Sequence, residues 1–358
     1  MDKKARLYTT ENDFRDPYSR DRDRIVHSRS FRILEYKTQV FINTDGDYFR
    51  TRLTHSIEVS QIARTISRHL GLSEALSEAI ALSHDLGHTP FGHVGGDELD
   101  KVLKRYGNGN GFEHNFQSFR VVTSLEKRYR EFNGLNLTYG TLEGILKHSA
   151  PYDKSFIPAA LKEQFRLDLH PSLEAAVVDH SDEIAYISHD IDDGIQHGLI
   201  SFETLGESEL VRKIQEHIRA EGLEERGELY RYRFVSQLIS YLITDLIENS
   251  SVTDEPIPAS ERMPIGFSKT VRTDLSRLKK ILFQELYRHE EIMKKMYTGK
   301  ICINKLFEAF YEEPQMLPKE YQVRIERFNK KGRAIADYIA SLSDRHALEL
   351  YRSLYFGT

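Results

Sequence analysis

Apolar side chains recur every three or four residues along most of this chain, and this spacing limits its fold more than any other feature. Between 54 and 70 they form one continuous stripe, made of Ile57, Val59, Ile62, Ala63, Ile66 and Leu70. Side chains at these intervals share one face of an α-helix. Gly71 supplies a stop for this helix, Ser73 an N-cap for a second helix over 74–86, and Gly87 the next stop.

The same spacing predicts helices along the rest of the chain. We expect a third helix from about Asp97 and a fourth from about Phe112, after a turn at 89–92 and a glycine-rich break at 107–111. Later helices are expected at 171–194, 234–247, 271–296 and 334–354, with a Ser/Pro-rich loop over 249–264. We find no convincing set of strands and no internal repeat. The sequence therefore predicts an all-α protein.

Composition narrows the class of protein. The single cysteine, Cys302, excludes an internal disulfide framework and a thiolate-rich zinc site. No apolar run approaches the ~20 residues that a membrane-spanning helix needs, and the charged start has no apolar stretch behind it. We therefore expect a cytoplasmic protein with no membrane partner. A basic stretch over 15–52 has two interpretations: a solvated helix face, or a set of arginines that meet an anionic ligand.

Histidine and aspartate stand together at helix positions where burial is expected. His84 and Asp85 end an otherwise apolar helix, and His55 lies one turn into the helix before it. A buried carboxylate is costly unless it is paired or bound to a metal. Asp182 begins an i, i+4, i+8 series with Tyr186 and Asp190, which we expect on one face of a later helix. The residues alone leave two interpretations open: a metal site or structural ion pairing. If they bind a metal, imidazole and carboxylate ligands would suit Mn, Fe, Zn or Mg.

The order of these residues resembles a known family. Arg-Leu-Thr-His-Ser at 52–56 and Ser-His-Asp-Leu-Gly-His at 83–88, followed by the acidic helix, resemble the signature of the HD superfamily. More narrowly, the chain resembles deoxyguanosinetriphosphate triphosphohydrolases and related deoxynucleotide hydrolases. The matching segments are 37–41, 48–52, 88–93, 112–115, 142–148, 182–186 and 337–340. The resemblance implies one large helical domain over 1–358, with an HD core at about 50–195 and a C-terminal helical region at about 205–358.

The resemblance also implies roles for individual residues. His55, His84, Asp85 and Asp182 match the four metal ligands, and Arg52 matches an arginine that grips the triphosphate. His93 and His114 match histidines beside the α-phosphate, one of which would protonate the departing oxygen. Tyr186 and Asp190 match residues that pack on the deoxyribose and bind its 3′-hydroxyl. Gln39 matches a residue near the sugar or base.

Several assignments are less direct. Many relatives carry a glutamate three residues after the position of His93, where this chain has Gly96, so we expect Asp97 to partner His93 instead. Lys147 is a candidate phosphate contact or a helix cap. His88 is a candidate for lining the site, for binding a second metal, or for stabilising the turn. By helical angle we expect His189 to point away from Asp182. Asp344 and Arg345 are candidates for reaching a neighbouring subunit.

The implied reaction converts a deoxynucleoside triphosphate, dGTP or a broader set, to a deoxynucleoside and inorganic triphosphate. The resemblance favours Mn or Mg as the divalent ion, with Fe or Zn as alternatives, and a homo-oligomer, hexameric or tetrameric, with a second, allosteric nucleotide as a further possibility. Two other functions stay open: an HD-type phosphodiesterase or nucleotidase, and a module that binds nucleotides or single-stranded nucleic acid with vestigial hydrolysis. No motif encodes the base preference.

Overall fold

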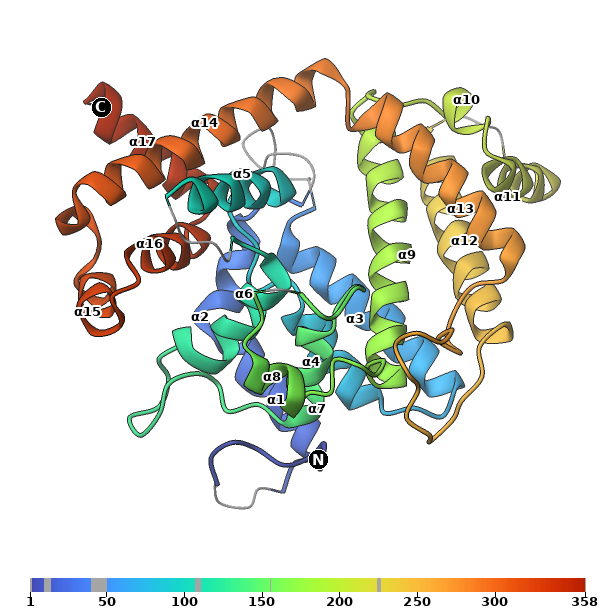
Figure 1. Ribbon diagram of the computed structural model, residues 1–358. Coiled ribbons are helices and arrows are strands. Elements are labelled where there is room, and N and C mark those ends of the chain that lie inside the picture. Colours follow the sequence, from blue (N-terminus) through green and yellow to red (C-terminus); the bar gives the residue numbers. More distant parts are fainter. Residues whose placement is uncertain are drawn as a thin grey trace.

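The structure is a computed structural model that describes residues 2–9, 14–39, 50–106, 111–154, 156–223 and 227–357, and these residues are helical or irregular (Figure 1). Extended pairing within them is limited to isolated bridges such as Thr38 with Thr51. The predicted all-α class is therefore confirmed. Residues 40–49 of the matching segments and most of the glycine-rich break, 107–110, lie outside the described residues. In the described part of the chain, no helix is both long and apolar enough to cross a membrane.

The first half of the chain holds short helices around three longer ones. They are α1 (Pro17–Val26), α2 (Arg29–Ile33), η1 (Leu34–Tyr36), α3 (Arg52–His69), α4 (Glu74–Ser83), α5 (Gly92–Arg105), α6 (His114–Arg120), the π-helical η2 (Val121–Leu125), α7 (Tyr139–Leu146), α8 (Ala159–Gln164) and α9 (Leu173–Gln196).

The second half of the chain continues with helices. They are α10 (Phe202–Leu205), α11 (Glu209–Ala220), α12 (Gly227–Glu248), α13 (Lys269–Ile281), the π-helical η3 (Leu282–Leu286), α14 (Glu290–Glu312), η4 (Pro314–Met316), α15 (Lys319–Phe328), α16 (Lys331–Ala340) and α17 (Asp344–Phe356).

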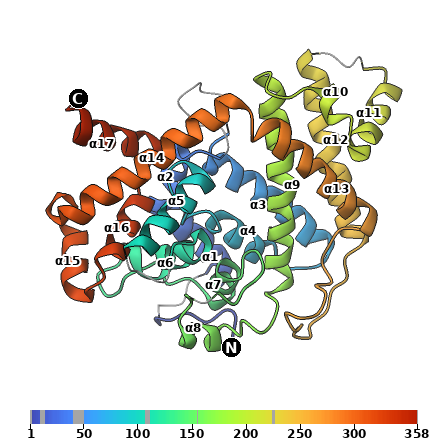
Figure 2. The ribbon, with the colours of Figure 1, turned by 45° about the horizontal axis from the view of Figure 1, so that its top comes forward.

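Helices α3, α4 and α9 form the centre of the molecule. The predicted stripe on α3 buries Val59, Ile62 and Ile66 completely or nearly so, against Ile80 of α4 and Ile184 of α9. Helices α10 to α13 lie on one side of α9, and α15 to α17 on the opposite side of the molecule (Figures 1 and 2). The long helix α14 joins the two sides and passes over α5.

The crossing of α14 over α5 depends on a close approach. Gly299 of α14 sits so near Phe91 that an added Cβ would lie 2.8 Å from the Phe91 Cβ. Phe91 is buried and has a positive φ of 61°, a conformation that non-glycine residues rarely adopt. This crossing presses the C-terminal half of the chain against the turn that follows α4.

Helix α3 confirms the predicted stripe except at Ile57, which is 51% exposed. The start of the helix is fixed by a capping box between Thr51 and Thr54. Ser73 caps α4 as predicted, but α4 ends at Ser83 rather than at residue 86. The predicted start of α5 at Asp97 was wrong, since the helix begins at Gly92, directly after the left-handed Phe91.

Two predicted long helices are also interrupted. The helix expected over 271–296 ends in the π-helical η3 and restarts at Glu290, after His289 adopts an extended conformation. The helix expected over 334–354 is split into α16 and α17, because Ser343 is extended and caps α17 by accepting from the His346 N–H. Apolar periodicity continues across both breaks and therefore could not reveal them.

Asp344, the first residue of α17, joins three segments of the chain. One carboxylate oxygen accepts from the Thr38 N–H at 2.9 Å and from the Thr38 hydroxyl, and the other accepts from the Phe91 N–H at 3.0 Å. Beside it, the buried Lys37 ammonium donates to the carbonyls of His88, at 2.5 Å, and Ala340, at 2.7 Å. Both oxygens of Asp344 thus have partners within their own chain, whereas the exposed Arg345 stays a candidate for reaching a neighbouring subunit.

Replacing Asp344 with alanine should therefore destabilise the protein. The substitution leaves buried N–H groups of Thr38 and Phe91 without acceptors, at a cost of roughly 2–4 kcal/mol in unfolding free energy. Urea unfolding followed by circular dichroism measures the change. Arg345→Ala is the matched control, since the neighbouring guanidinium is exposed and, among the described residues, forms an ion pair only with Glu349, at 3.6 Å. Equal unfolding midpoints for the two variants would contradict the role assigned to Asp344.

Candidate metal centre

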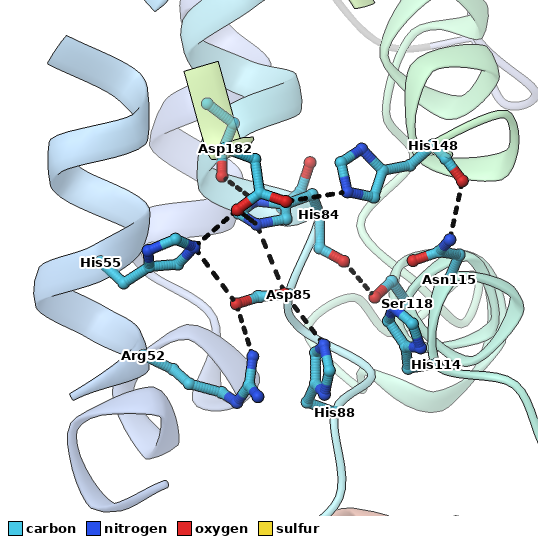
Figure 3. A network of polar contacts seen from close by, with 12 residues as sticks. Arg52, His55, His84, Asp85, His88, His114, Asn115, Ser118, His148 and Asp182 are labelled. Carbon is cyan, nitrogen blue, oxygen red and sulfur yellow. Dashed lines mark hydrogen bonds and ion pairs between the residues drawn. The ribbon is translucent and has the colours of Figure 1, made fainter. Parts of the chain in front are cut away.

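The predicted metal ligands come from the three central helices. His55 lies in the second turn of α3, His84 is the C-cap residue of α4, and Asp182 is near the middle of α9. Their side chains point toward one another between these helices (Figure 3). One ligand atom from each of the three lies within 4.8 Å of the others. The packing of α3, α4 and α9 thus brings together residues that are 127 positions apart.

The distances within the cluster leave room for one ion. Oδ1 of Asp182 lies 2.9 Å from Nε2 of His55 and 3.8 Å from Nε2 of His84. Asp85 adjoins the same space, with its oxygens 3.4 Å from His84 Nε2 and 4.0 Å from His55 Nε2. Three of the four expected ligands therefore converge directly, and the fourth contacts both imidazoles.

The His84 ring provides the best test of whether a metal fits. Its Nδ1 lies 2.6 Å from the carbonyl of Ala81, which can only accept, so Nδ1 carries the hydrogen. The lone pair of Nε2 is then directed into the cluster, where this atom is buried with no hydrogen-bond partner. Burial lowers the pKa of His84, which favours the neutral form that binds metals. A buried imidazole lone pair without a hydrogen-bond partner, next to carboxylates, is the arrangement that a divalent ion requires of its ligands.

The carboxylate side of the cluster is anionic. Burial alone would raise the pKa of Asp182, but hydrogen bonds from His148 and His55 bring it well below its usual value. Burial alone would lower the pKa of His55, and Asp182 and Asp85 raise it instead. The side chains of His55 and Asp182, 2.9 Å apart, therefore stabilise each other's charged forms.

Arg52 extends the site beyond the cluster. It begins α3, is buried, and donates from Nη1 to Oδ2 of Asp85 at 2.8 Å. Its Nε and Nη2 groups are buried with no hydrogen-bond partner. Unpaired buried guanidinium donors are costly, and an anionic group with several oxygens would satisfy them. For Arg52, this arrangement supports the second interpretation of the basic stretch over 15–52, in which arginines meet an anionic ligand.

His148 is a residue of the cluster that the sequence left unassigned. Its Nε2 lies 3.6 Å from Oδ2 of Asp182, and its Nδ1 lies 2.5 Å from Asp179, one turn earlier on α9. Burial alone would lower the pKa of His148, but Asp179 and Asp182 hold it well above the usual value. The sequence offered two signals for this residue: its place at the end of the matching segment 142–148, and the i, i+3 spacing of Asp179 and Asp182.

Lys147 does not point to this cluster. Its buried ammonium lies 2.9 Å from a carboxylate oxygen of Glu143 and 3.4 Å from the carbonyl of His170. Lys147 is also the C-cap residue of α7, which fits the alternative of a helix cap, and the phosphate contact stays a prediction.

The expected orientation of His189 was also wrong. Seven residues of α-helix advance about 700°, only about 20° short of two turns, so His189 and Asp182 share a face of α9. The His189 ring lies edge-on to His55, with centroids 5.6 Å apart, and its Nε2 lies 2.5 Å from Glu58. Glu58 is held in turn by Arg50 at 3.5 Å. His189 therefore packs against His55, and Glu58 and Arg50 hold His189 in place.

Asp190 departs from the expected common face. Eight residues of helix bring it about 80° around the axis from Asp182, and its carboxylate accepts from the hydroxyl of Tyr287 in the segment after η3. Burial raises the pKa of Asp190 to about 7, although this hydrogen bond opposes the shift. Tyr186 lies between the two acids and is partly exposed, with the Lys279 ammonium 5.4 Å from its ring centroid.

The remaining expected residues lie near the turn after α4. Gln39 has a buried Oε1 with no hydrogen-bond partner. His93 and His114 have ring centroids 5.6 Å apart, and both adjoin His88. Asp97 is exposed, and within the described residues no ion pair joins it to His93. Burial lowers the pKa of His93, and the charge of Asp97 is among those that oppose this shift, so the pairing of Asp97 with His93 stays a prediction.

Fold and site together define a helical HD-domain protein. Residues 52–187 match the family model of the HD domain, and residues 265–353 match the Phosphohydrolase-associated domain. A deoxyguanosinetriphosphate triphosphohydrolase-like protein of Wolinella succinogenes is 61% identical over 360 residues, covering 98% of this chain and 99% of that relative. Proteins with the same description in Bordetella pertussis and Geobacter sulfurreducens are 47% and 43% identical, over 95% and 98% of this chain and 90% and 92% of those relatives. The chain belongs to this deoxyguanosinetriphosphate triphosphohydrolase-like family.

Removing the His84 imidazole should weaken metal binding. We expect His84→Ala to lower the affinity for Mn²⁺ by more than about 100-fold, beyond what loss of an outer partner costs. Equilibrium dialysis with elemental analysis measures the affinity of the purified protein. His217→Ala is the control, because His217 is exposed on α11 and its one ion pair with a described residue is to Glu221, at 3.6 Å. Unchanged affinity in His84→Ala would show that the ion binds elsewhere.

Asp190 predicts a distinct pH dependence of stability. Because burial raises its pKa to about 7 in the folded protein, from an unfolded value near 3.9, folding favours the protonated carboxyl. Its contribution is complete below about pH 4 and is lost as the pH rises through about 7. Asp190→Asn keeps an acceptor for Tyr287 but does not ionise, so its stability relative to wild type should increase from pH 5 to pH 8. Denaturant unfolding at both pH values tests this, and a constant difference would contradict it.

Proposed function

We propose that this protein hydrolyses deoxynucleoside triphosphates to a deoxynucleoside and inorganic triphosphate. The observation that carries the proposal is Arg52, whose unpaired guanidinium donors lie beside the His55, His84 and Asp182 cluster. A triphosphate has the charge and the oxygens that such donors require. The printed description of the similar proteins, which names deoxyguanosine triphosphate, supports the same substrate class.

His55, His84, Asp85 and Asp182 would hold the divalent ion, with Mn or Mg favoured. Such an ion supplies Lewis-acid polarisation of a phosphoryl oxygen and a water of lowered pKa. Arg52 would bind the triphosphate and keep its α-phosphorus near the cluster, while Nη1 remains with Asp85. Holding the reacting groups in place accounts for a large part of the catalysis expected from such a site.

His93 and His114 would act on the leaving group. As water bonds to the α-phosphorus, the bond to the 5′-oxygen breaks, and that oxygen must gain a proton to leave as the deoxynucleoside. Burial and the neighbouring His93 lower the pKa of His114 in the free protein, so its imidazole is neutral there. A bound triphosphate would favour the protonated form, and one of the two histidines would then carry the proton to the 5′-oxygen.

Tyr186 and Asp190 would form the sugar-binding part of the site. Asp190, oriented by the hydroxyl of Tyr287, would accept a hydrogen bond from the 3′-hydroxyl. Tyr186 would pack on the deoxyribose and leave little room for a 2′-hydroxyl, which would select deoxynucleotides. The unpaired Oε1 of Gln39 is a candidate contact to the sugar or base. Contacts to the base itself are left open.

Assembly belongs to the same proposal. Large apolar side chains are exposed on several helices of the second half of the chain, including Leu229 at 67%, Tyr297 at 65% and Phe356 at 67%. Closed symmetric assembly is the common way to cover such surfaces. We propose a homo-oligomer, a hexamer or a tetramer, in which a second nucleotide could regulate activity.

Product analysis tests the reaction. Purified protein is incubated with Mn²⁺ or Mg²⁺ and each of the four deoxynucleoside triphosphates, alone and in pairs. We expect a deoxynucleoside and intact triphosphate, and activity that needs a pair would indicate allosteric activation. Release of monophosphate, pyrophosphate or γ-phosphate would favour a phosphodiesterase or nucleotidase. Absence of turnover in metal-loaded protein would favour a binding module.

Arg52→Ala should lower kcat/KM by roughly 100- to 1,000-fold, because the variant loses donors that meet charge on the phosphates. Steady-state kinetics on the substrate identified above measure the effect, and circular dichroism checks that the variant folds. Arg68→Ala is a matched control on the same helix, since Arg68 is exposed and pairs with Glu74 at 2.7 Å, its one ion pair within the described part of the chain. Similar kcat/KM values for the two variants would remove Arg52 from the site.

A further inference from the structure

Three arginines gather where α15 and α16 meet α6, on the side of the molecule opposite α10 to α13 (Figures 1 and 2). Arg120 is the last residue of α6, Arg324 lies in α15 and Arg333 lies in α16. The Nη2 atoms of Arg120 and Arg324 lie 2.5 and 3.5 Å from the same oxygen, Oδ2 of Asp337. Arg333 donates from Nη2 to the carbonyl of Gly111 at 2.6 Å. We call Arg120, Arg324 and Arg333 the arginine cluster.

The arginine cluster carries more positive charge than its acid can balance. Asp337 is almost completely buried and is the only carboxylate that pairs with the cluster in the described part of the chain. Asp100 also acts on Arg333, but its carboxylate is already engaged by the Lys104 ammonium at 2.7 Å. Three guanidinium groups and one carboxylate leave an excess of positive charge, which is costly at a partly buried position unless an anion balances it.

Unmet hydrogen-bond donors point the same way. The Nε of Arg120 is buried with no hydrogen-bond partner. Arg324 has only its long ion pair with Asp337 among the described residues. Burial lowers the pKa of Arg333, and the charge of the neighbouring Arg120 lowers it further. The three guanidinium groups are therefore close enough to repel one another, and they keep donors that Asp337 does not satisfy.

We propose that Arg120, Arg324 and Arg333 form a second anion site, separate from the metal centre, which binds a phosphate group. The planar guanidinium fork matches pairs of phosphate oxygens, and a phosphate has the charge and the number of oxygens to satisfy several guanidinium groups at once. The side chains of Arg120 and Arg324 are each 21% exposed, so an ion reaches them from solvent.

The surroundings of the arginine cluster extend the same chemistry. Arg29 of α2 is exposed, and its charge acts on the hydroxyls of Tyr321 and Tyr338, where it opposes the rise in pKa that burial causes. The two tyrosine rings lie 5.1 Å apart and are both partly exposed. The phosphate group could thus belong to an inorganic phosphate or to a nucleotide whose nucleoside contacts these rings.

This second anion site does not depend on the proposed hydrolysis. Helix α6 begins with His114 and ends with Arg120, which places the two residues roughly 9 Å apart along the helix axis. Inactive protein would still bind phosphate at the arginine cluster. Failure of this proposal would leave the product analysis untouched, and failure of the proposed reaction would leave the binding measurement untouched.

Isothermal titration calorimetry with inorganic triphosphate tests the proposal. The titration uses metal-free Arg52→Ala protein, in which the guanidinium that we assign to the substrate is absent. We expect one triphosphate per chain. Adding Arg324→Gln should weaken the affinity at least about 10-fold, because the variant loses charge-assisted hydrogen bonds to the anion. Arg324 is the residue of choice, since its ion pair with Asp337 is the longer one and its loss disturbs the fold least.

Arg68→Gln in the same background is the control, because it removes an equal charge from an exposed position of α3. Its affinity for triphosphate should stay unchanged. Parallel titrations with inorganic phosphate and with dGTP identify the source of the phosphate group. Tighter binding of dGTP than of triphosphate would assign the site to a nucleotide, and equal binding would assign it to the phosphates alone.

Two results would overturn the proposal. The first is no triphosphate binding to the metal-free Arg52→Ala protein. The second is equal affinity in Arg324→Gln and Arg68→Gln, which would place the anion elsewhere. Circular dichroism checks that each variant folds, and Arg333→Gln, with the same expected loss of affinity, gives an independent test should Arg324→Gln fail to fold.

Discussion

The contact between Asp182 and the imidazoles of His55 and His84 is the interaction on which the rest of the site depends. It requires α3, α4 and α9 to meet at one level, because a carboxylate in this position must be paired or bound to a cation. The apolar contacts of the same helices, such as Ile62 and Ile184, hold the helices together but would tolerate other registers. The polar cluster therefore specifies the register, and the hydrophobic core supplies most of the stability.

A second constraint comes from the C-terminal half of the chain. Asp344 and Lys37 hold the backbone of the turn between His88 and Phe91, and Gly299 lets α14 press on that turn. The turn leads directly into the first turn of α5, where His93 lies. The region that matches the Phosphohydrolase-associated domain thus contributes no ligand to the metal cluster, yet it fixes the position of residues that we assign to the phosphates. This explains physically why the two regions occur in one chain.

Much of this could be predicted from the sequence, and the failures have identifiable causes. The periodicity of α3 and the residues His55, His84 and Asp182 were found because each depends on local spacing and on the chemistry of burial. The partners of Lys147, His189 and Asp190 were not predicted. Glu143 lies one turn before Lys147 on α7, whereas Glu58 and Tyr287 reach His189 and Asp190 only through packing between helices. The interruptions before Glu290 and at Ser343 were missed because apolar residues continue on both sides of each break.

The most direct test of the central claim is anomalous diffraction from crystals grown with Mn²⁺ and inorganic triphosphate. The account predicts a manganese peak within bonding distance of His55, His84 and Asp182, with phosphate oxygens against the guanidinium of Arg52. A manganese peak remote from these three residues, or triphosphate bound away from Arg52, would contradict it.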